Sequence, residues 1–265
     1  MFKKNPGKRL AAFILSLALL MVLLTGASCG KQAETGATEA PPQDTLYQVS
    51  TLGALNAGVF DGAVDYATLE SHGDFGIGSF QGLNGEMVAL DGKFYQVRTD
   101  GVPVEVSVAQ TAPYAMVTFF QADLTGNPPA GLDYAGLQQF AGSMLPTPNY
   151  FYAVRVEGEF AYLKIRSVPG QQPPYPTLTQ VVAEQVVWEK ENIRGTMIGF
   201  FSPAYVGGLD TSGYHLHFIS EDGKSGGHVL DCRTGAVTLK LDETADVDLV
   251  LPSGIGFQRA DLTPK

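Results

Sequence analysis

Three of the four histidines in this sequence lie within one short stretch, YHLHFISEDGKSGGHVLD. His215 and His217 are separated by one residue, so in a β-strand their side chains project from the same face. His228 follows after an Asp-Gly pair, which is a strong signal for the turn of a β-hairpin. Imidazoles are ligands that zinc and other transition metals bind well. The stretch therefore predicts a metal site.

The register of this hairpin determines whether all three rings meet. With Asp222 and Gly223 as a two-residue turn, counting outward places His217 directly opposite His228. Cross-strand partners share a face with Cβ atoms about 5 Å apart, so the three imidazoles converge, with His215 diagonal to the other two. A bulge at either of the two glycines before His228 would move that ring to the other face, and this alternative stays open.

Three protein ligands suit a catalytic metal better than a structural one, because they leave coordination positions for water or substrate. Zinc is the expected ion, and nickel, manganese, cobalt or iron are alternatives at such a site. The competing interpretation is that these are ordinary hydrogen-bonded histidines. His72, in the stretch ESHGD, is instead expected to cap the C-terminal end of a helix.

Short β-strands separated by turn residues make up most of the chain that would position these histidines. Runs rich in Val, Tyr and Phe predict strands over residues 75–80, 86–97, 115–120, 150–166, 194–200, 214–219, 227–239 and 247–251. Apolar spacing predicts helices over residues 65–72, 132–145 and 177–188. Hairpin turns are expected at Asp91-Gly92 and at Gly158, besides the one in the histidine stretch.

The Pro-rich stretch from residue 127 to 149 contains one helix signal and few strand signals. We interpret it as the seam between an N-terminal domain over residues 45–148 and a C-terminal domain over residues 149–265. The sequence has two cysteines, and Cys29 is expected to be lipidated, so Cys232, in the apolar segment VLDC, is left without a disulfide partner within the chain. It is expected to be a small core residue.

The first residues have the layout of a secretory signal peptide. A basic segment precedes an apolar run over residues 10–24, which is short for a membrane span of about 20 residues. Small residues then lead to Cys29 and resemble the lipobox of bacterial lipoproteins, although Gly26 stands where leucine is usual. Residues 1–28 are expected to be removed as a lipoprotein signal peptide and Cys29 to be lipidated. An uncleaved anchor helix is the alternative.

Residues 29–44 are rich in Pro, Gly, Thr and acidic residues and have no large apolar side chain, so we interpret them as a disordered tether. Loss of residues 1–28 removes four positive charges and no acids, which moves the formal net charge from −10 to −14. Such an anionic protein repels nucleic acid and anionic lipid. We expect an extracytoplasmic protein that contacts the membrane only through its lipid.

Several stretches together resemble the bacterial α-acetolactate decarboxylases, with this chain as a secreted, lipoprotein-type member. These stretches are LYQVSTLGALNAGVFDG, HGDFGIGSFQGLNGEMVALDGKFYQV, FYAVRVEGEF, KIRSVPGQQPPYPTL, ENIRGTMIGFFSPAYVGG and the histidine stretch itself. The resemblance implies an α+β fold of two domains, with an N-terminal mixed β-sheet with helices and a C-terminal, mainly antiparallel sheet that carries the metal. It also implies zinc on the three histidines and a homodimer.

The resemblance further implies the decarboxylation of 2-acetolactate, a 2-hydroxy-3-oxo acid, to acetoin and CO₂. Loss of CO₂ leaves an enediolate whose charge a zinc ion would stabilise as a Lewis acid. Arg166 would hold the substrate by bidentate hydrogen bonds. Glu86 is the expected proton donor that makes the acetoin chiral, provided that its pKa is raised. Ser79 stands where the family often has a threonine that lines the pocket.

The C-terminal end departs from the family, whose members usually have a glutamate in a tail that reaches the metal. This chain ends in QRADLTPK, with no acid after Asp261. Water, Asp261 or a neighbouring subunit are alternatives for the missing ligand. Two other functions also stay open, namely a zinc-binding lipoprotein for metal capture or transport and a structural metal site in an adhesion domain.

Overall fold

The computed structural model describes residues 44–263 of the chain. The predicted signal peptide, Cys29 and all of the predicted tether except its last residue lie outside this range, so these expectations remain predictions. Among the described residues, no helix combines the length and the apolar character that crossing a bilayer requires.

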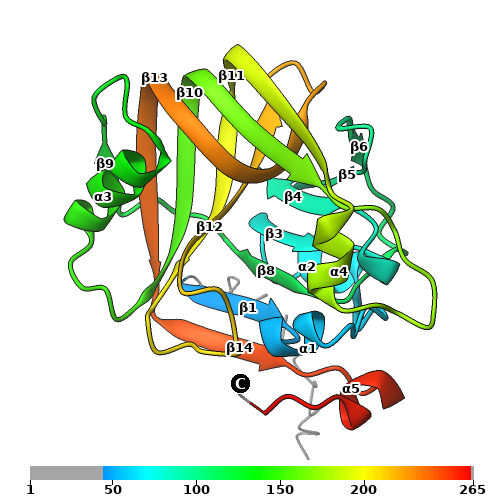
Figure 1. Ribbon diagram of the computed structural model, residues 1–265. Helices are drawn as coiled ribbons and strands as arrows, with labels where there is room; N and C mark the ends of the chain where they lie inside the picture. Colours follow the sequence, from blue (N-terminus) through cyan, green and yellow to red (C-terminus); the bar gives the residue numbers. More distant parts are fainter. Residues whose placement is uncertain (1–43, 264–265) are drawn as a thin grey trace, which may run out of the picture. The chain divides into compact units, whose positions relative to one another are not determined.

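A seven-stranded sheet forms from the first part of the chain together with one late strand (Figure 1). β14 pairs in parallel with β1, and the remaining neighbours are antiparallel, so the sheet is mixed. In spatial order the strands are β14 (Asp246–Val250), β1 (Thr45–Val49), β8 (Ala115–Thr118), β3 (Phe75–Ser79), β4 (Glu86–Leu90), β5 (Lys93–Val97) and β6 (Pro103–Glu105).

A second sheet is antiparallel throughout and contains three long strands. Its order is β10 (Phe151–Ser167), β11 (Val186–Ser202), β12 (Gly213–Ser220), β13 (Gly226–Thr244) and β9 (Leu124–Gly126). Because β13 also pairs with β10, the first four strands form a closed ring of pairings. This closure brings the ends of β10, β12 and β13 together.

Five short helices and one two-stranded ribbon complete the described fold. The helices are α1 (Leu52–Asn56), α2 (Tyr66–Glu70), α3 (Tyr134–Met144), α4 (Leu178–Ala183) and α5 (Ile255–Arg259), the 3₁₀ turn covers Gln81–Leu83, and the ribbon pairs β2 (Val64–Asp65) with β7 (Thr111–Ala112). Figure 1 shows α3 beside β9 and β13. The N-cap residues Asp65 and Asp133 accept hydrogen bonds from the first turns of α2 and α3, as N-cap carboxylates commonly do.

Three apolar clusters follow from the alternation of buried and outward residues along these strands. The central cluster joins the two sheets and includes Ile77 and Met116 from the first with Ala153 and Phe200 from the second. Another cluster fills the ring formed by β10 to β13 and packs against α3, and a third lies under α2 on the other face of the first sheet. The α+β class is therefore confirmed.

The hairpin expected at Gly158 is wrong. β10 continues through this residue as a single strand of 17 residues, and Gly158 pairs with Gly195 on one side and with Val237 on the other. A Cβ atom on Gly158 would lie 2.2 Å from the Ala236 carbonyl oxygen. The glycine therefore permits a close approach at a β-bulge, which sequence reading mistakes for a turn.

The helix expected over residues 177–188 is too long. α4 ends at Ala183, and Val186, Val187 and Trp188 already belong to β11. These β-branched and aromatic residues favour a strand that pairs with β10 along most of its length. The helices expected over residues 65–72 and 132–145 are confirmed as α2 and α3, and the Asp91-Gly92 turn joins β4 to β5 as expected.

Strand membership does not follow the seam predicted near residue 148. β14 lies beside β1 in the first sheet although it comes late in the chain, and β9 lies beside β13 in the second sheet although it comes early. Each sheet therefore includes one strand from the other half of the sequence. The domain boundary itself stays a prediction.

Candidate metal centre

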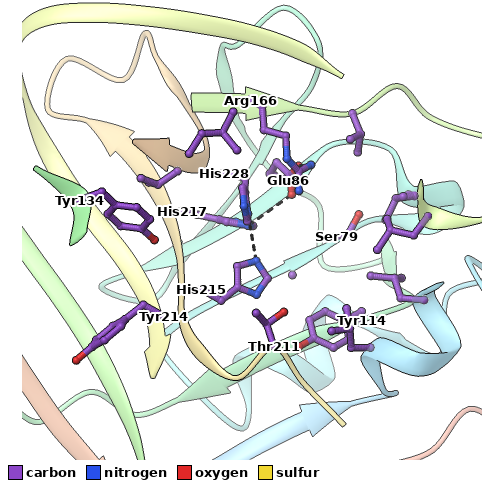
Figure 2. Close-up of a pocket in the computed structure, with 18 residues that line it drawn as sticks. Ser79, Glu86, Tyr114, Tyr134, Arg166, Thr211, Tyr214, His215, His217 and His228 are labelled. Atoms are coloured by element: carbon purple, nitrogen blue, oxygen red, sulfur yellow. Dashed lines mark hydrogen bonds and ion pairs between the residues drawn. The ribbon is translucent and has the colours of Figure 1, made fainter. Parts of the chain in front are cut away.

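A cavity of about 440 Å³ lies where the two sheets meet. Strands β3, β4, β10, β12 and β13 all contribute to its wall, as do α1 and α4. Figure 2 shows the three histidines at its centre, with Glu86 and Arg166 beside them. Its apolar lining is Leu52, Leu55, Leu83, Val168, Leu178, Val229 and Leu230, with Gly78, and its polar and aromatic lining is Ser79, Glu86, Tyr114, Tyr134, Arg166, Thr211, Tyr214, His215, His217 and His228.

The predicted register of the histidine hairpin is confirmed, because His217 pairs with His228. The turn is longer than expected: four residues separate Ser220 from Ser225, whose carbonyl oxygen accepts a hydrogen bond of 2.8 Å from the Ser220 amide. The loop has the same centre as the predicted two-residue turn, so the register is unchanged. Gly227 causes no bulge between β12 and β13 at this point, and His228 stays on the shared face.

The three imidazoles fit a divalent metal. One nitrogen from each ring lies within 4.8 Å of the other two, and His215 Nε2 is 3.2 Å from His228 Nδ1. Two nitrogens that bind one zinc ion at about 2 Å in tetrahedral geometry lie roughly 3.3 Å apart. His217 Nδ1 donates to the Met87 carbonyl oxygen at 2.7 Å, and its buried Nε2 has no hydrogen-bond partner.

That hydrogen bond matters because it sets the tautomer of the His217 ring. A carbonyl oxygen only accepts, so Nδ1 carries the proton and Nε2 presents its lone pair to the cavity. Ligating histidines usually have a partner of this kind behind them. The buried Nδ1 atom of His215 also has no hydrogen-bond partner. Unsatisfied buried nitrogens are expensive, and a metal ion bound by His217 Nε2 would satisfy that atom.

Burial keeps these histidines in the neutral form that binds metals. Loss of solvent is the main cause that lowers the pKa of His215 and of His217 to about 3. The pKa of His228 also falls well below its usual value, first through burial and then through the positive charge of Arg166. The metal-free site therefore needs no deprotonation of these rings near neutral pH.

Glu86, which is buried, and Arg166, which is half-buried, form an ion pair at the edge of the histidine cluster. Arg166 Nη1 donates to Glu86 Oε1 at 2.7 Å, and Glu86 Oε2 lies 3.5 Å from His217 Nε2. Strand register places both, because Arg166 pairs with His228 across β10 and β13, while Glu86 begins β4 opposite Ser79. Sequence segments some 80 residues apart thus meet at one point.

Burial and the ion pair act on Glu86 in opposite directions. Burial raises the pKa of the Glu86 carboxyl, and the positive charge of Arg166 lowers it. Burial is the larger effect, so the net direction is upward. A carboxyl group held near a cluster of metal ligands with a raised pKa has the character of a proton donor.

Ser79 lies at the cavity, whereas His72 and Cys232 lie outside it. Ser79 lines the cavity, and its hydroxyl donates to the Gly85 carbonyl oxygen at 2.8 Å. His72 lies outside the cavity, and its Nδ1 donates to the Thr68 carbonyl oxygen at the end of α2, which confirms the expected cap. Cys232 is a buried core residue as expected, and burial raises the pKa of its thiol to about 12.

The C-terminal end does not reach this cavity within the described residues. None of the lining residues follows Leu230 in the chain. Asp261 lies in a separate pocket with Gly53 and Asn56, beside α1. It therefore does not take the place of the additional carboxylate ligand that was expected from the resemblance.

Sequence reading missed several polar residues of the wall, among them Tyr114, Thr211 and the buried Asp210 behind them. Tyr114 precedes β8, and the other two lie in the glycine-rich loop before β12. Neither the segment before β8 nor the loop before β12 has a hydrophobic periodicity or a turn motif that would single out one of these side chains. The only clue in the sequence is that the loop leads directly into His215.

Comparisons with known proteins agree with this geometry. A family model described as alpha-acetolactate decarboxylase matches residues 46–264. An alpha-acetolactate decarboxylase of Methanosarcina mazei is 48% identical over 219 residues, which cover 83% of this chain and 76% of that protein. The Bacillus subtilis protein of the same name is 39% identical over 221 residues, covering 83% of this chain and 87% of that protein. A crystal structure of the Bacillus subtilis strain 168 enzyme matches with a TM-score of 0.81 at 39% identity, over 83% of this chain and 94% of that chain.

Proposed function

Since this chain belongs to the alpha-acetolactate decarboxylase family, we propose that it converts 2-acetolactate to acetoin and CO₂ in the cavity around His215, His217 and His228. The observation that carries the proposal is the convergence of these three neutral imidazoles with the Glu86–Arg166 pair. The cavity of about 440 Å³ is large enough for a small hydroxy-oxo acid.

The three histidines would hold a divalent metal, with zinc as the expected ion. When bound, this ion supplies a Lewis acid that stabilises the negative charge which develops on the substrate oxygens as CO₂ leaves. His217 is held for this task by its hydrogen bond to Met87. Nickel, manganese, cobalt or iron would suit the same ligands, and metal analysis of the purified protein distinguishes them.

Arg166 would bind the substrate carboxylate, and Glu86 would protonate the carbon from which CO₂ has left. The guanidinium of Arg166 presents further N–H groups beside its bond to Glu86, and these would hold the substrate carboxylate. The bond between the carboxylate carbon and its neighbour breaks, and the electron pair moves onto the ketone oxygen. Glu86 would then give its proton to the carbon that lost CO₂, from one face only, and would regain a proton from water.

Release of CO₂ from racemic acetolactate, with and without a chelator, tests this proposal. We expect turnover that chelation abolishes and added zinc restores. Glu86→Gln removes the proton donor, and Arg166→Ala removes the carboxylate contact, so each should lower kcat/KM by about 10²- to 10⁴-fold. Glu221→Gln and Arg194→Ala are matched controls, because this pair is exposed on the surface.

A contrary result is easily recognised. If the metal-loaded protein shows no turnover, or if Glu86→Gln and Arg166→Ala behave like Glu221→Gln and Arg194→Ala, the enzymatic proposal is wrong. Tight zinc binding without turnover would favour the alternative of a lipoprotein that captures metal.

We also propose export and lipid anchoring through Cys29. The support is the basic segment and the apolar run before this cysteine. Incorporation of labelled palmitate by the parent and not by Cys29→Ser would agree with this. If the parent protein incorporates no labelled palmitate and is recovered from the soluble fraction, the proposal of lipid anchoring is wrong.

We propose that the protein is a homodimer. β14 is the edge strand of the first sheet, and Val247 and Leu249 on it are exposed. Edges of this kind readily pair with another copy. Light scattering should give a dimer for the parent and a monomer for Val247→Lys combined with Leu249→Lys; a monomeric parent contradicts the proposal.

A further inference from the structure

The loop between β11 and β12, residues 203–212, contains a buried aspartate that no part of the proposed reaction uses. Asp210 is 3% exposed. Its Oδ1 atom accepts from the Tyr114 hydroxyl at 2.5 Å, and its Oδ2 atom accepts from the Ser202 hydroxyl at 2.5 Å. Both carboxyl oxygens are thus held by hydroxyl groups from different strand ends, which leaves this side chain little freedom to move.

The same loop is also fastened to α1 and to β1. The carbonyl oxygens of Gly208 and Leu209 accept from the backbone amides of Gly53 and Leu52, at 2.9 Å each. The buried amide group of Gln48 donates to the Leu209 carbonyl oxygen at 3.0 Å. These bonds satisfy amides at the start of α1, which have no partner within the helix.

Asp210 therefore directly precedes the segment that contains two cavity residues. Thr211 is the next residue and lines the cavity, and His215 follows four residues later on β12. Figure 2 shows Tyr114 and Thr211 on the side of the His215 ring that faces away from His228. Fixing Asp210 thus fixes the path of the backbone into the first metal ligand.

We propose that Asp210 is a positioning residue of the metal centre, which holds the 203–212 loop through Tyr114 and Ser202 and so places both His215 and Thr211. This rests on the proposed metal-dependent function. The residue does not contact the metal or the substrate.

The test is the zinc dissociation constant of Asp210→Asn, measured by competition with a chromophoric chelator. We expect it to rise about 10- to 100-fold. At saturating zinc, kcat should recover while KM stays raised, because zinc restores the metal centre but not the position of Thr211. Should Asp210→Asn fail to fold, Tyr114→Phe combined with Ser202→Ala keeps the carboxylate, removes both hydroxyl donors and should show the same split between kcat and KM.

Asp242→Asn is the matched control, since Asp242 is also a fully buried aspartate and lies outside the cavity lining. It should alter the melting temperature without altering the zinc dissociation constant. An unchanged constant in Asp210→Asn, or the same shift in both variants, overturns the inference while the parent still binds zinc and turns over acetolactate. A parent that binds no zinc overturns the proposed metal site as well.

Discussion

The neutral state of the three histidines has a measurable consequence for metal binding. Histidines with the usual pKa near 6.5 would together lose about two protons on binding zinc at pH 6. Because burial lowers the pKa of His215 and His217 to about 3 and that of His228 well below its usual value, we expect almost no proton release. Titration calorimetry at pH 6 in buffers of different ionisation enthalpy measures this number, and release of about two protons would contradict the burial of the rings.

Ser79 should contribute to stability and to the position of Glu86. Its hydroxyl donates to the buried carbonyl of Gly85, the residue before Glu86. Ser79→Ala leaves that carbonyl unsatisfied and should lower the free energy of unfolding by about 1–2 kcal/mol, with a fall in kcat. Ser143→Ala is the control, because the Ser143 hydroxyl also donates to a backbone carbonyl but is exposed. Denaturant unfolding that gives equal losses for both variants would count against this role.

The residues of the site differ in how far the sequence could reveal them. The three histidines lie in one hairpin, so local spacing and register were enough to bring them together. Glu86 and Arg166 lie far from that hairpin in sequence, and only the resemblance to a family pointed to them. The contact between Tyr114 and Asp210 joins residues 96 positions apart, and no local pattern encodes it.

At the scale of elements, β11 approaches β12 closely at Gly199, beside the first metal ligand. Gly199 pairs with Leu216, and a Cβ atom there would lie 1.9 Å from the His215 carbonyl oxygen. Gly199→Ala must therefore push β12 away and move His215. We expect a loss of about 2–4 kcal/mol in the free energy of unfolding, as for other overpacked or strained sites, together with weaker zinc binding.

The control for Gly199→Ala is Gly254→Ala. Gly254 is the N-cap of α5 with φ −68°, and a Cβ atom there would have no neighbour within 4 Å. Because alanine is a poorer N-cap than glycine, this variant should lose about 0.5–1 kcal/mol in the free energy of unfolding, less than Gly199→Ala, and should bind zinc like the parent. Chemical denaturation and chelator competition measure both variants. If Gly199→Ala binds zinc as tightly as Gly254→Ala does, β12 does not need this close contact.

Secondary-structure elements were predicted correctly where the sequence signal was local, and incorrectly where contacts with distant strands determined the structure. The Asp91-Gly92 hairpin has a turn pair that favours this structure in any context. Gly158 also lies between two runs of strand-forming residues but lacks such a turn pair, and neighbours on both sides of β10 keep the strand continuous there. The early start of β11 likewise depends on its pairing with β10, which is not visible in residues 186–188 alone.

At the scale of the whole molecule, Asp242 makes stability depend on pH. It is fully buried on β13, where the backbone N–H of Gln121 donates to its Oδ2 atom. Burial is the main cause that raises its pKa from 3.8 to about 7, and the negative charge of Asp123 adds to this effect. In the unfolded chain the group ionises near its ordinary value, so the folded state loses stability as the pH rises from about 4 to 7.

Asp242→Asn should remove this loss. Its free energy of unfolding, relative to the parent, should rise between pH 4 and pH 7 by at most about 4 kcal/mol and stay level above pH 7. Urea unfolding at several pH values measures the difference. Glu105→Gln, at an exposed position, is the control for the removal of one acidic group from the surface. A difference for Asp242→Asn that does not vary with pH would show that this carboxyl group ionises normally in the fold.

The exchange of β9 and β14 between the two sheets also limits which recombinants of the gene encode a protein that folds. Neither half of the gene encodes a complete sheet, because each half supplies one strand to the sheet of the other. A recombination event near residue 148 would pair β1 of one parent with β14 of the other, and β9 of one parent with β13 of the other. It would also combine Glu86 of one parent with the three histidines of the other. We therefore expect natural variants of this protein to be inherited across that point as one block, with chimaeras surviving only between close relatives.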